Sequence, residues 1–410
     1  MDLKSGYPFW AVKNGLMCKF PPLRSDVRCD VAVVGGGITG ALIADELGRH
    51  GFEVVVLDQR DIGWGSSAAS TALLQYEIDT HMVELAKMYG EFSAVMAYKA
   101  CAEAITDLRD LATDLGDVDF GMQESLYYAS KRNHKQALAE EFELRIKHGF
   151  EARWLDSGRL KEDFGIKAPG AILTALAARV DPYRMASRLL LRLAEHGGRV
   201  FDRTVVDTME ASEHDVLLRT PNGCSVSARF VVMAAGYETQ KWLKQAVSRN
   251  RSSYAFITDP IENNELGRLA STMIWESARP YLYLRTTGDG RLLVGGDDDD
   301  IDIPERRHRR VEGKARGLSR KVKKLFPHLP MTPAFSWGGT FAETEDGLPF
   351  FGEHPQYGPR VLFAMAYGGN GISYSMIGAR LLRAKIEGRS HPLAELFGFS
   401  RLSAPSASSI

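Results

Sequence analysis

Hydrophobic residues along this chain recur with two different periods, and each period predicts a different kind of element. Short apolar runs at 30–34, 53–57, 230–235 and 361–366 are typical of strands that are buried on both faces. Glycines follow the first and the last of these runs, and apolar residues at helical spacing come after the glycines. The pattern therefore predicts two strand–turn–helix units, one near each end of the chain.

Apolar residues three or four positions apart predict helices elsewhere in the chain. The segment 82–111 has this spacing, which predicts one long helix or two joined helices with a stripe that packs in the core. A second helix is expected at 135–148. A third should cover 181–198, because Asp181-Pro182 places an acid at the N-cap and a proline in the first turn.

Other segments have the composition of strands and turns. Residues 118–129 are expected to form a hairpin or strand pair, and two short strands should flank the Pro-Asn-Gly turn at 221–223. Four runs between 254 and 296 are typical of antiparallel strands. The charged segment 297–324, which begins with four aspartates, is interpreted as a solvated loop and an exposed helix rather than a partner-binding patch.

The glycine turn after the first strand has the spacing of a dinucleotide-binding motif. In its G-x-G-x-x-G pattern, Gly35 permits the tight turn, Gly37 the approach of a pyrophosphate, and Gly40 close packing of helix on strand. The free N–H groups of the helix N-terminus favour phosphate, and Asp58 at the end of the next strand can bind a ribose. A dinucleotide site is therefore predicted, although this motif alone does not distinguish NAD from FAD.

These elements predict an α/β protein of two domains, as the length of 410 residues also indicates. A discontinuous, Rossmann-like nucleotide-binding domain should contain an inserted, mostly antiparallel substrate domain. The second glycine turn near the C-terminus is unusual for NAD dehydrogenases and favours FAD. The predicted boundaries are 27–115, 150–236 and 335–390 for the nucleotide-binding domain, 116–149 and 237–334 for the substrate domain, 1–26 for an N-terminal arm, and 391–410 for a tail ending in the disordered sequence SAPSASSI.

Composition and charge narrow the possible functions. The net charge is −1, from 51 basic and 52 acidic residues, so electrostatics give no reason to expect nucleic acid as a partner. No apolar run approaches the ~20 residues of a membrane helix, and the N-terminus lacks the features of a signal peptide. The four cysteines are far apart and form no CxxC pair, so we expect reduced thiols, a cytoplasmic location and no metal site.

Four motifs follow one another across nearly the whole chain. They are VAVVGGGITGALIADELGRHGFEVVVLD from 31, GSSAAS from 65, VVMAAG from 231, and WGGTFAETEDGLPFFG from 337 together with YGGNGI from 367. With these motifs the chain resembles the FAD-dependent amine and amino-acid oxidoreductases of the D-amino acid oxidase, glycine oxidase and sarcosine oxidase group, the DAO family. The resemblance implies FAD as the cofactor, and it is much less specific for a substrate.

The resemblance also implies which residues contact each part of FAD. At the second glycine turn chemistry gives an independent reason, because reduction places negative charge at the pyrimidine edge of the flavin, where a helix N-terminus is stabilising. The implied contacts are Gly35, Gly37, Thr39 and Gly40 at the pyrophosphate; Asp58 and Gln59 at the ribose and adenine; Ser66, Ser67 and Thr71 beside the pyrophosphate and flavin; Val206 at the adenine; Ala235 and Gly236 at the nucleotide; and Gly368, Gly369, Asn370, Gly371 and Ile372 at the pyrimidine edge.

Two departures from the family pattern concern the attachment of FAD and the substrate. No cysteine follows Cys224 and GSSAAS contains no histidine, so the resemblance implies noncovalent FAD. Glycine oxidase-like members place a carboxylate-binding arginine where this chain has Phe341, and a second arginine can occur where it has Gly369. Neither residue can replace a bidentate guanidinium. Either another arginine binds the carboxylate, or the substrate is not a free α-amino acid.

Strand alternation supplies candidates for a substrate pocket. The odd-numbered residues from 279 to 285 share one strand face, so they could line the pocket with their tyrosines and hold an anion with an arginine. In the opposite arrangement this face meets solvent and leucines 282 and 284 point inward. The candidates are Gln75, Tyr76, Tyr254, Arg279, Tyr281, Tyr283, Arg285 and Phe341.

We therefore expect a flavoenzyme that oxidises a C–N bond of an amine or N-substituted amino acid by hydride transfer to flavin N5, followed by hydrolysis of the imine. No catalytic residue is predicted, and either O2 or another electron acceptor could reoxidise the flavin. Three alternatives remain open. They are a conventional amino-acid oxidase or dehydrogenase using Arg279 or Arg285, a flavoprotein with structural FAD or a macromolecular substrate such as modified tRNA, and an NAD dehydrogenase.

Overall fold

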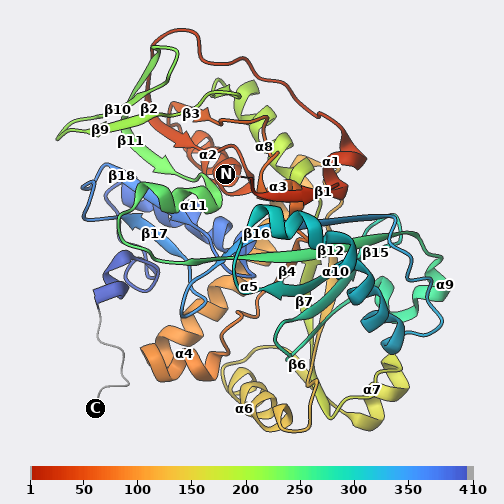
Figure 1. Cartoon of the computed structure of the whole chain (residues 1–410). Coiled ribbons are helices and arrows are strands. Elements are labelled where there is room, and N and C mark those ends of the chain that lie inside the picture. Colours follow the sequence, from red (N-terminus) through yellow and green to blue (C-terminus); the bar gives the residue numbers. More distant parts are fainter. Residues whose placement is uncertain (1, 404–410) are drawn as a thin grey trace.

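The computed structural model describes residues 2–403, so the disorder predicted for SAPSASSI concerns residues outside this range, apart from Ser403. Two β-sheets organise the described chain, one in each lobe of the molecule (Figure 1). An eight-stranded sheet forms the centre of the upper lobe in that view, and a ten-stranded sheet forms the centre of the lower lobe.

The eight-stranded sheet is the mostly parallel sheet that the first glycine motif predicts. In spatial order its strands are β17 (Phe350–Glu353), β18 (Val361–Met365), β11 (Ser225–Met233), β2 (Val27–Val34), β3 (Val54–Leu57) and β8 (Arg199–Phe201), with β10 (Val216–Arg219) and β9 (Thr208–Ala211) extending from β11. The strands from β18 to β8 pair in parallel, whereas β17 and β10 are antiparallel to their neighbours. All four residues of β3 are buried, as its unbroken apolar run predicts.

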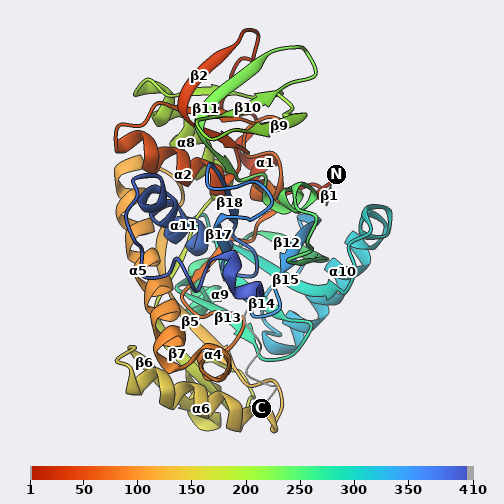
Figure 2. The same ribbon diagram turned by 90° about the vertical axis from the view of Figure 1, so that its left-hand side faces the viewer.

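Four helices cover one face of this sheet (Figure 2). They are α2 (Ile38–Arg49), α5 (Glu91–Leu115), α8 (Pro182–Glu195) and α11 (Gly371–Ile386), which pack against one another as well as on the strands. The 3₁₀ helix η1 (Gly236–Trp242) lies beside β18 and contributes to the core on the other face.

Two helix predictions are confirmed in detail. α4 (Met82–Tyr89) ends at Gly90, whose φ of 82° breaks the helix, and α5 begins at the next residue, so the arrangement of two joined helices is the correct one. α8 begins as predicted, because the Asp181 side chain accepts a hydrogen bond from the Arg184 N–H at 2.9 Å. α6 (His134–Lys147) also lies where its periodicity placed it.

The ten-stranded sheet is antiparallel except for one pair. Its strands in spatial order are β1 (Lys4–Gly6), β16 (Phe335–Glu343), β12 (Arg249–Pro260), β15 (Arg291–Asp299), β14 (Leu282–Thr286), β13 (Thr272–Glu276), β5 (Gly121–Tyr128), β7 (Gly170–Arg179) and β4 (Leu73–Gln75), with β6 (Ala152–Asp156) also on β7. Only β13 and β5 run parallel among the described pairs.

Helices cover one face of the ten-stranded sheet; on the other face α6 packs against β5, β7 and β13, and the rest turns towards the upper lobe. On the covered face lie α10 (Pro304–Leu325), α7 (Ser157–Phe164), α9 (Asn263–Leu266) and η2 (Gly267–Ala270). The buried stripe of α10 packs against Leu292 and Val294 of β15. This leaves the opposite face of the same strands free to build a site.

Sheet membership corrects the predicted domain boundaries. β6 and β7 come from the segment 150–236 and β16 from 335–390, yet all three strands belong to the ten-stranded sheet. An apolar or alternating run predicts a strand but not the sheet that it joins, because its partners are distant in sequence. For the same reason the hairpin predicted at 118–129 is wrong: a single strand, β5, pairs with β7 and β13.

Three segments are more ordered than predicted. The N-terminal arm contains β1 and α1 (Phe9–Asn14), and it buries Trp10 completely. In the predicted tail, Phe397 packs in the hydrophobic core, as does Phe399 at the start of η3 (Phe399–Ser403). The run of four aspartates is not a solvated loop, because three of them end β15 and Asp299 is buried.

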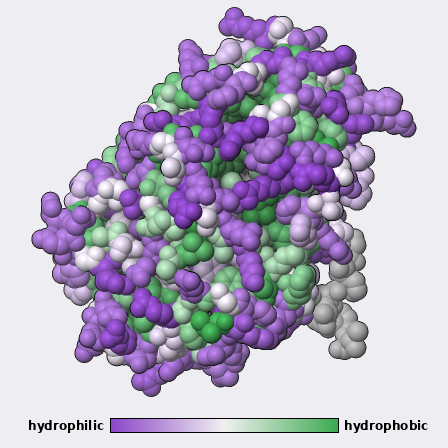
Figure 3. Space-filling model, turned by 180° about the vertical axis from the view of Figure 1, so that it is seen from behind, coloured by the Kyte–Doolittle hydropathy of each residue, from purple (hydrophilic) through white to green (hydrophobic). Residues whose placement is uncertain are grey.

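The longest helices are amphipathic. α5 and α10 both alternate buried apolar positions with exposed charged ones. No helix within residues 2–403 is both long enough and apolar enough to cross a membrane. On the face shown in Figure 3, hydrophilic side chains cover most of the surface and hydrophobic side chains lie between them.

Candidate active site

A cavity between the two sheets brings together nearly all of the predicted cofactor residues. It extends from the ends of β2 and β3 in the upper lobe to the strands of the lower lobe around Trp275. The predicted residues that line it are Gly35, Gly37, Thr39, Asp58, Gln59, Ser66, Ser67, Thr71, Val206, Ala235, Gly236, Gly368, Gly369, Asn370, Gly371 and Ile372.

The first glycine turn presents backbone rather than side chains to this cavity. Gly35 has a φ of 118°, and a Cβ there would lie 2.3 Å from the carbonyl oxygen of Ala234. Gly37 is the N-cap of α2 and has no side chain to cap it, although the Ile38 N–H donates to Ser67 Oγ at 2.8 Å; the following N–H groups of the first turn are available to an anion. Gly40 does not line the cavity. A Cβ there would lie 1.8 Å from the Gly35 carbonyl oxygen, so its role is close packing.

Two polar side chains beside this turn, those of Asp58 and Ser66, could bind a ligand. The Asp58 carboxylate accepts hydrogen bonds from the backbone N–H groups of Gly36 and Arg60, both at 2.7 Å. Burial nevertheless raises the pKa of Asp58 to about 6. The buried hydroxyl of Ser66 has no hydrogen-bond partner among the described residues, and buried polar groups of this kind normally have one.

Three buried side chains hold three successive carbonyl groups of the loop after Ser66. The carbonyl oxygens of residues 69–71 accept hydrogen bonds from Trp337 Nε1 (2.8 Å), Trp10 Nε1 (2.7 Å) and Arg285 Nε (2.7 Å), in that order. All three donors are at most 1 % exposed. They fix the backbone of this cavity-lining loop from behind.

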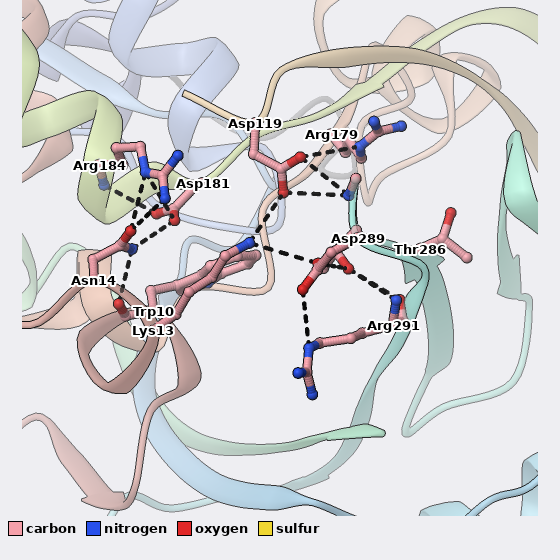
Figure 4. A network of polar contacts seen from close by, with 12 residues as sticks. Trp10, Lys13, Asn14, Asp119, Arg179, Asp181, Arg184, Thr286, Asp289 and Arg291 are labelled. Carbon is pink, nitrogen blue, oxygen red and sulfur yellow. Dashed lines mark hydrogen bonds and ion pairs between the residues drawn. The ribbon is translucent and has the colours of Figure 1, made fainter. Parts of the chain in front are cut away.

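No motif indicates the role of Trp10, because its hydrogen-bond partner is a backbone carbonyl 60 residues away. Helix α1 positions Trp10 through the polar network in Figure 4, where Asn14 Nδ2 donates to Asp181 Oδ2 at 2.7 Å. In the same network Lys13 lies 3.5 Å from Asp289. The N-terminal segment is thus part of the site.

The second glycine turn is held by the residues that follow β4. Asn370 Nδ2 donates to the carbonyl oxygens of Gln75 and Glu77, at 2.9 and 3.0 Å. The Gly369 N–H donates to Asp79 Oδ2 at 2.9 Å. No side chain caps α11, and residues of its first turn line the cavity. A second positive helix end therefore faces the same space as the first.

Side chains of the ten-stranded sheet line the other end of the cavity. Tyr281 and Tyr283 face it, whereas leucines 282 and 284 pack in the core on the α10 side. Of the two arrangements that alternation left open, the structure has the one in which the tyrosines point into the cavity. Gln75 and Phe341 also line the cavity.

Three of the substrate candidates do not line the cavity, and a fourth, Tyr254, only borders it. Tyr76 is 2 % exposed and belongs to the core behind the cavity, since adjacent positions point to opposite sides of an extended chain. Tyr254 borders the cavity, but its hydroxyl donates to Asp299 on the α10 face at 2.8 Å. Arg279 is exposed, with its guanidinium over a tyrosine ring at 3.6 Å. Arg285 is the buried donor described above and does not line the cavity.

The two ends of the cavity differ in the charge of the side chains that line them. Arg60 and Lys241 line the part around Asp58. No lysine or arginine in the described chain lines the part around Tyr283. That part is bordered instead by three carboxylates, which sequence analysis did not single out: Asp79, Asp298 and Glu343.

The fold and the cavity define a two-lobed dinucleotide-binding protein of the flavoprotein type. A parallel sheet carries the glycine turn and an acid after the next strand, and a second helix N-terminus faces the same cavity. The tight turn requires glycine at 35, because a Cβ there would collide with the Ala234 carbonyl oxygen, and the buried Ser66 hydroxyl beside it lacks a hydrogen-bond partner among the described residues. The residues present therefore fit FAD.

The chain belongs to the DAO family of FAD dependent oxidoreductases, whose family model matches residues 30–385. It is accordingly an FAD-dependent oxidoreductase, and the NAD alternative is wrong.

Individual relatives are distant but extend over most of the chain. The chain is 25% identical over 404 residues to a putative Rieske 2Fe-2S iron-sulfur protein of Bacillus subtilis, covering 96% of this chain and 75% of that protein. It is 26% identical over 398 residues to gamma-glutamylputrescine oxidoreductase of Escherichia coli, covering 93% and 88%. The crystal structure of glycine oxidase from Geobacillus kaustophilus has the same fold, with a TM-score of 0.76, 21% identity and coverage of 91% and 98%.

Proposed function

We propose that the protein oxidises a C–N bond of an amine or an N-substituted amino acid and binds FAD noncovalently. The observation that carries this proposal is the substrate end of the cavity, which is aromatic and acidic and has no lining arginine or lysine among the described residues. A free carboxylate would find no bidentate partner there, whereas the acidic and aromatic side chains suit an amine, so of the two substrate classes the lining favours the amine. The names of two relatives, gamma-glutamylputrescine oxidoreductase and glycine oxidase, refer to compounds with such bonds.

Noncovalent binding is supported by the lining of the cavity. No cysteine or histidine of the described residues lines it, and these are the residues that attach FAD in covalent relatives. The four cysteines, Cys18, Cys29, Cys101 and Cys224, are distributed elsewhere in the fold.

We assign the cofactor contacts from the positions of the lining residues. Asp58 and Gln59 would bind the ribose and adenine side, with Val206 nearby. The first turn of α2 would bind the pyrophosphate through its N–H groups beyond that of Ile38, which donates to Ser67. The residues 368–372 would hold the pyrimidine edge of the flavin, with the N-terminus of α11 stabilising negative charge there.

When bound, FAD would supply the acceptor of the hydride, and thus of the two electrons it carries, from the substrate carbon. The chain supplies position and environment. Tyr281, Tyr283 and Trp275 form apolar walls that exclude water from the amine, and Phe341 fills the space of a carboxylate anchor. The imine product then hydrolyses, and no dedicated acid–base residue is needed for that step.

The proposal is tested with purified holoprotein. It should be yellow, and acid precipitation should leave the colour in the supernatant; a yellow pellet would contradict noncovalent binding. Amines and N-substituted amino acids should bleach the flavin band under anaerobic conditions. If no amine in a broad panel bleaches it, the proposed reaction is wrong. Reoxidation with O2 and with artificial acceptors then separates an oxidase from a dehydrogenase.

A conventional amino-acid oxidase is the weaker candidate. Arg285 cannot bind a substrate carboxylate, because its guanidinium is fully buried and donates to the carbonyl oxygens of Thr71 and Val180. Only Arg279 remains, exposed beside Tyr281. An Arg279→Met variant with an unchanged KM for carboxylate substrates would remove this candidate.

A further inference from the structure

A β-bulge turns one aspartate of β15 towards the cavity. Leu292 and Val294 pack on the α10 side, so regular alternation would place Asp298 on that side as well. The pairing of β12 with β15 instead shifts between Ser252 and Tyr254, opposite an extra residue in β15. Asp298 therefore lines the cavity. Bulges are frequent beside active sites, where they redirect a side chain.

Backbone conformation marks the same position. Gly296 has a φ of 125°, and Asp297, which is not a glycine, has a φ of 56°. A non-glycine residue in this region of φ costs free energy that the surrounding structure must offset, and such residues cluster at functional sites. The strain here has one visible result, which is the direction of Asp298.

The aspartates next to Asp298 are all neutralised by ion pairs. Asp297 lies 3.1 Å from Lys321, Asp299 lies 2.6 Å from Arg310, and Asp300 lies 2.7 Å from Arg251. These cations belong to α10 or β12.

Asp298 differs from its neighbours because it has no ion-pair partner among residues 2–403. Its Oδ1 atom is shielded from solvent and accepts no hydrogen bond from any described residue. An unpaired, shielded carboxylate oxygen is costly unless a ligand pairs with it. Burial raises the pKa of Asp298 to about 6, so the group is still mostly ionised at neutral pH.

The surroundings of Asp298 suit an organic cation rather than a metal ion. Glu343, which is ion-paired with Arg251, and Asp79 line the same part of the cavity, and the negative charge of each raises the pKa of Asp298, whereas a hydrogen bond with Ser253 and the charge of Arg279 lower it. No three acidic, histidine or cysteine residues of the described chain could hold a metal ion together. The remaining walls are aromatic, including Trp275 and Tyr283, and aromatic faces attract organic ammonium groups.

We propose that the substrate carries a second positive charge, and that Asp298 binds it, with Glu343 and Asp79 adding to the field. The substrate class is an alkane diamine or a longer polyamine, in which one amine is oxidised while the distal ammonium pairs with Asp298. This inference rests on the proposed function, since it specifies the substrate of that same site. It makes Asp298 a specificity-determining residue.

The test compares matched substrates on the holoenzyme. Anaerobic bleaching and steady-state rates are measured with diamines of three to eight carbons, with monoamines of equal length and with sarcosine. We expect kcat/KM for the best diamine to exceed that for its matched monoamine by roughly 30-fold or more, as expected for a desolvated charge pair. If kcat/KM for the monoamines equals that for the diamines, this inference is wrong while the proposed function stands. If no amine bleaches the flavin, the proposed function itself fails.

Variants then assign the effect to one residue. Asp298→Asn should raise KM for the diamine roughly 30-fold, with KM for the monoamine unchanged. Asp300→Asn is the matched control from the same aspartate run, and it should change neither value, because Asp300 is exposed and lies outside the cavity. Flavin content and thermal unfolding temperature are measured for both variants. An equal effect of Asp298→Asn on both substrates would overturn the assignment.

Discussion

The two ends of the cavity are built from different parts of the polypeptide. The nucleotide end is made of backbone: glycine turns at 35–40 and 368–371 and the N-termini of two helices. The substrate end is made of side chains carried by strands β14, β15 and β16. A site built from backbone requires glycine at particular positions, so a substitution at one of these positions should weaken binding of any ligand at that end of the cavity. Side-chain sites depend on register, so a substitution there should affect only the choice of substrate.

The largest effect should come from filling the backbone end. Gly40→Ala places a Cβ 1.8 Å from the Gly35 carbonyl oxygen, where no side chain can yield. We expect a loss of about 3 kcal/mol in the stability of the holoprotein and loss of bound flavin, measured by thermal unfolding and absorbance.

The matched control for this variant is Gly48→Ala on the same helix. There the new Cβ would meet only the terminal Cδ1 of Leu193, at 2.7 Å, which can move. This variant should keep its flavin. Equal behaviour of the two variants would mean that the sensitivity belongs to α2 as a whole and not to the glycine turn.

Next in size is the effect of removing a buried guanidinium behind the cavity. Arg285→Met should leave the carbonyl oxygens of Thr71 and Val180 without donors, at a cost of about 1–3 kcal/mol for each unpaired group. Unfolding temperature and flavin content should both fall. Arg279→Met should alter neither, because this arginine is exposed. A stable Arg285→Met variant with a raised KM for carboxylates would place Arg285 at the substrate end after all.

Acidification should weaken the nucleotide end through Asp58. Ionised Asp58 can accept hydrogen bonds from ribose hydroxyls, and its pKa of about 6 means that this form is lost as the pH falls below 6. Affinity for FAD should therefore fall about tenfold between pH 7 and pH 5. Fluorescence titration of the apoprotein measures it. Asp58→Asn should bind more weakly at pH 7 and show no such decline; a decline that persists would assign it to another group.

The smallest effect should come from loosening the loop at 69–71. Trp10→Phe removes the donor to the Ser70 carbonyl oxygen while keeping an aromatic ring, and should cost about 1 kcal/mol. Flavin dissociation should become faster in proportion. Trp64→Phe is the control, since Trp64 is 38% exposed. If both variants release flavin at the same rate, the N-terminal segment does not support the site.

Predictability from sequence follows the same division between the two ends. The glycines at 35, 37 and 368 and the acid at 58 could be placed together in one site because their spacing reflects backbone geometry. Their contacts with FAD stay a prediction. Tyr281 and Tyr283 could be narrowed to two arrangements, but alternation alone does not say which face is inward. Asp298 could not be assigned, because a bulge reverses the alternation and only strand pairing reveals it.

Pairing over long distances limited the rest. Residues 118–129 were expected to form a hairpin or strand pair, whereas the single strand β5 pairs with β7 and β13, because the sequence of a strand does not identify its partner strand. Arg285 was a candidate for binding a substrate carboxylate, but its guanidinium donates to backbone carbonyl groups of distant segments. Trp10 has the same kind of partner. Such contacts depend on the finished fold and leave no motif.

The cavity is lined by residues from Leu3 to Ser373, so its walls come from nearly the whole length of the chain. During synthesis the glycine turn that starts α2 leaves the ribosome early, whereas the turn that starts α11 is made more than 300 residues later. A nascent chain would therefore have a cradle for phosphate long before it has a place for the flavin ring. Tight flavin binding would report that translation has passed α11, and truncated chains would remain colourless.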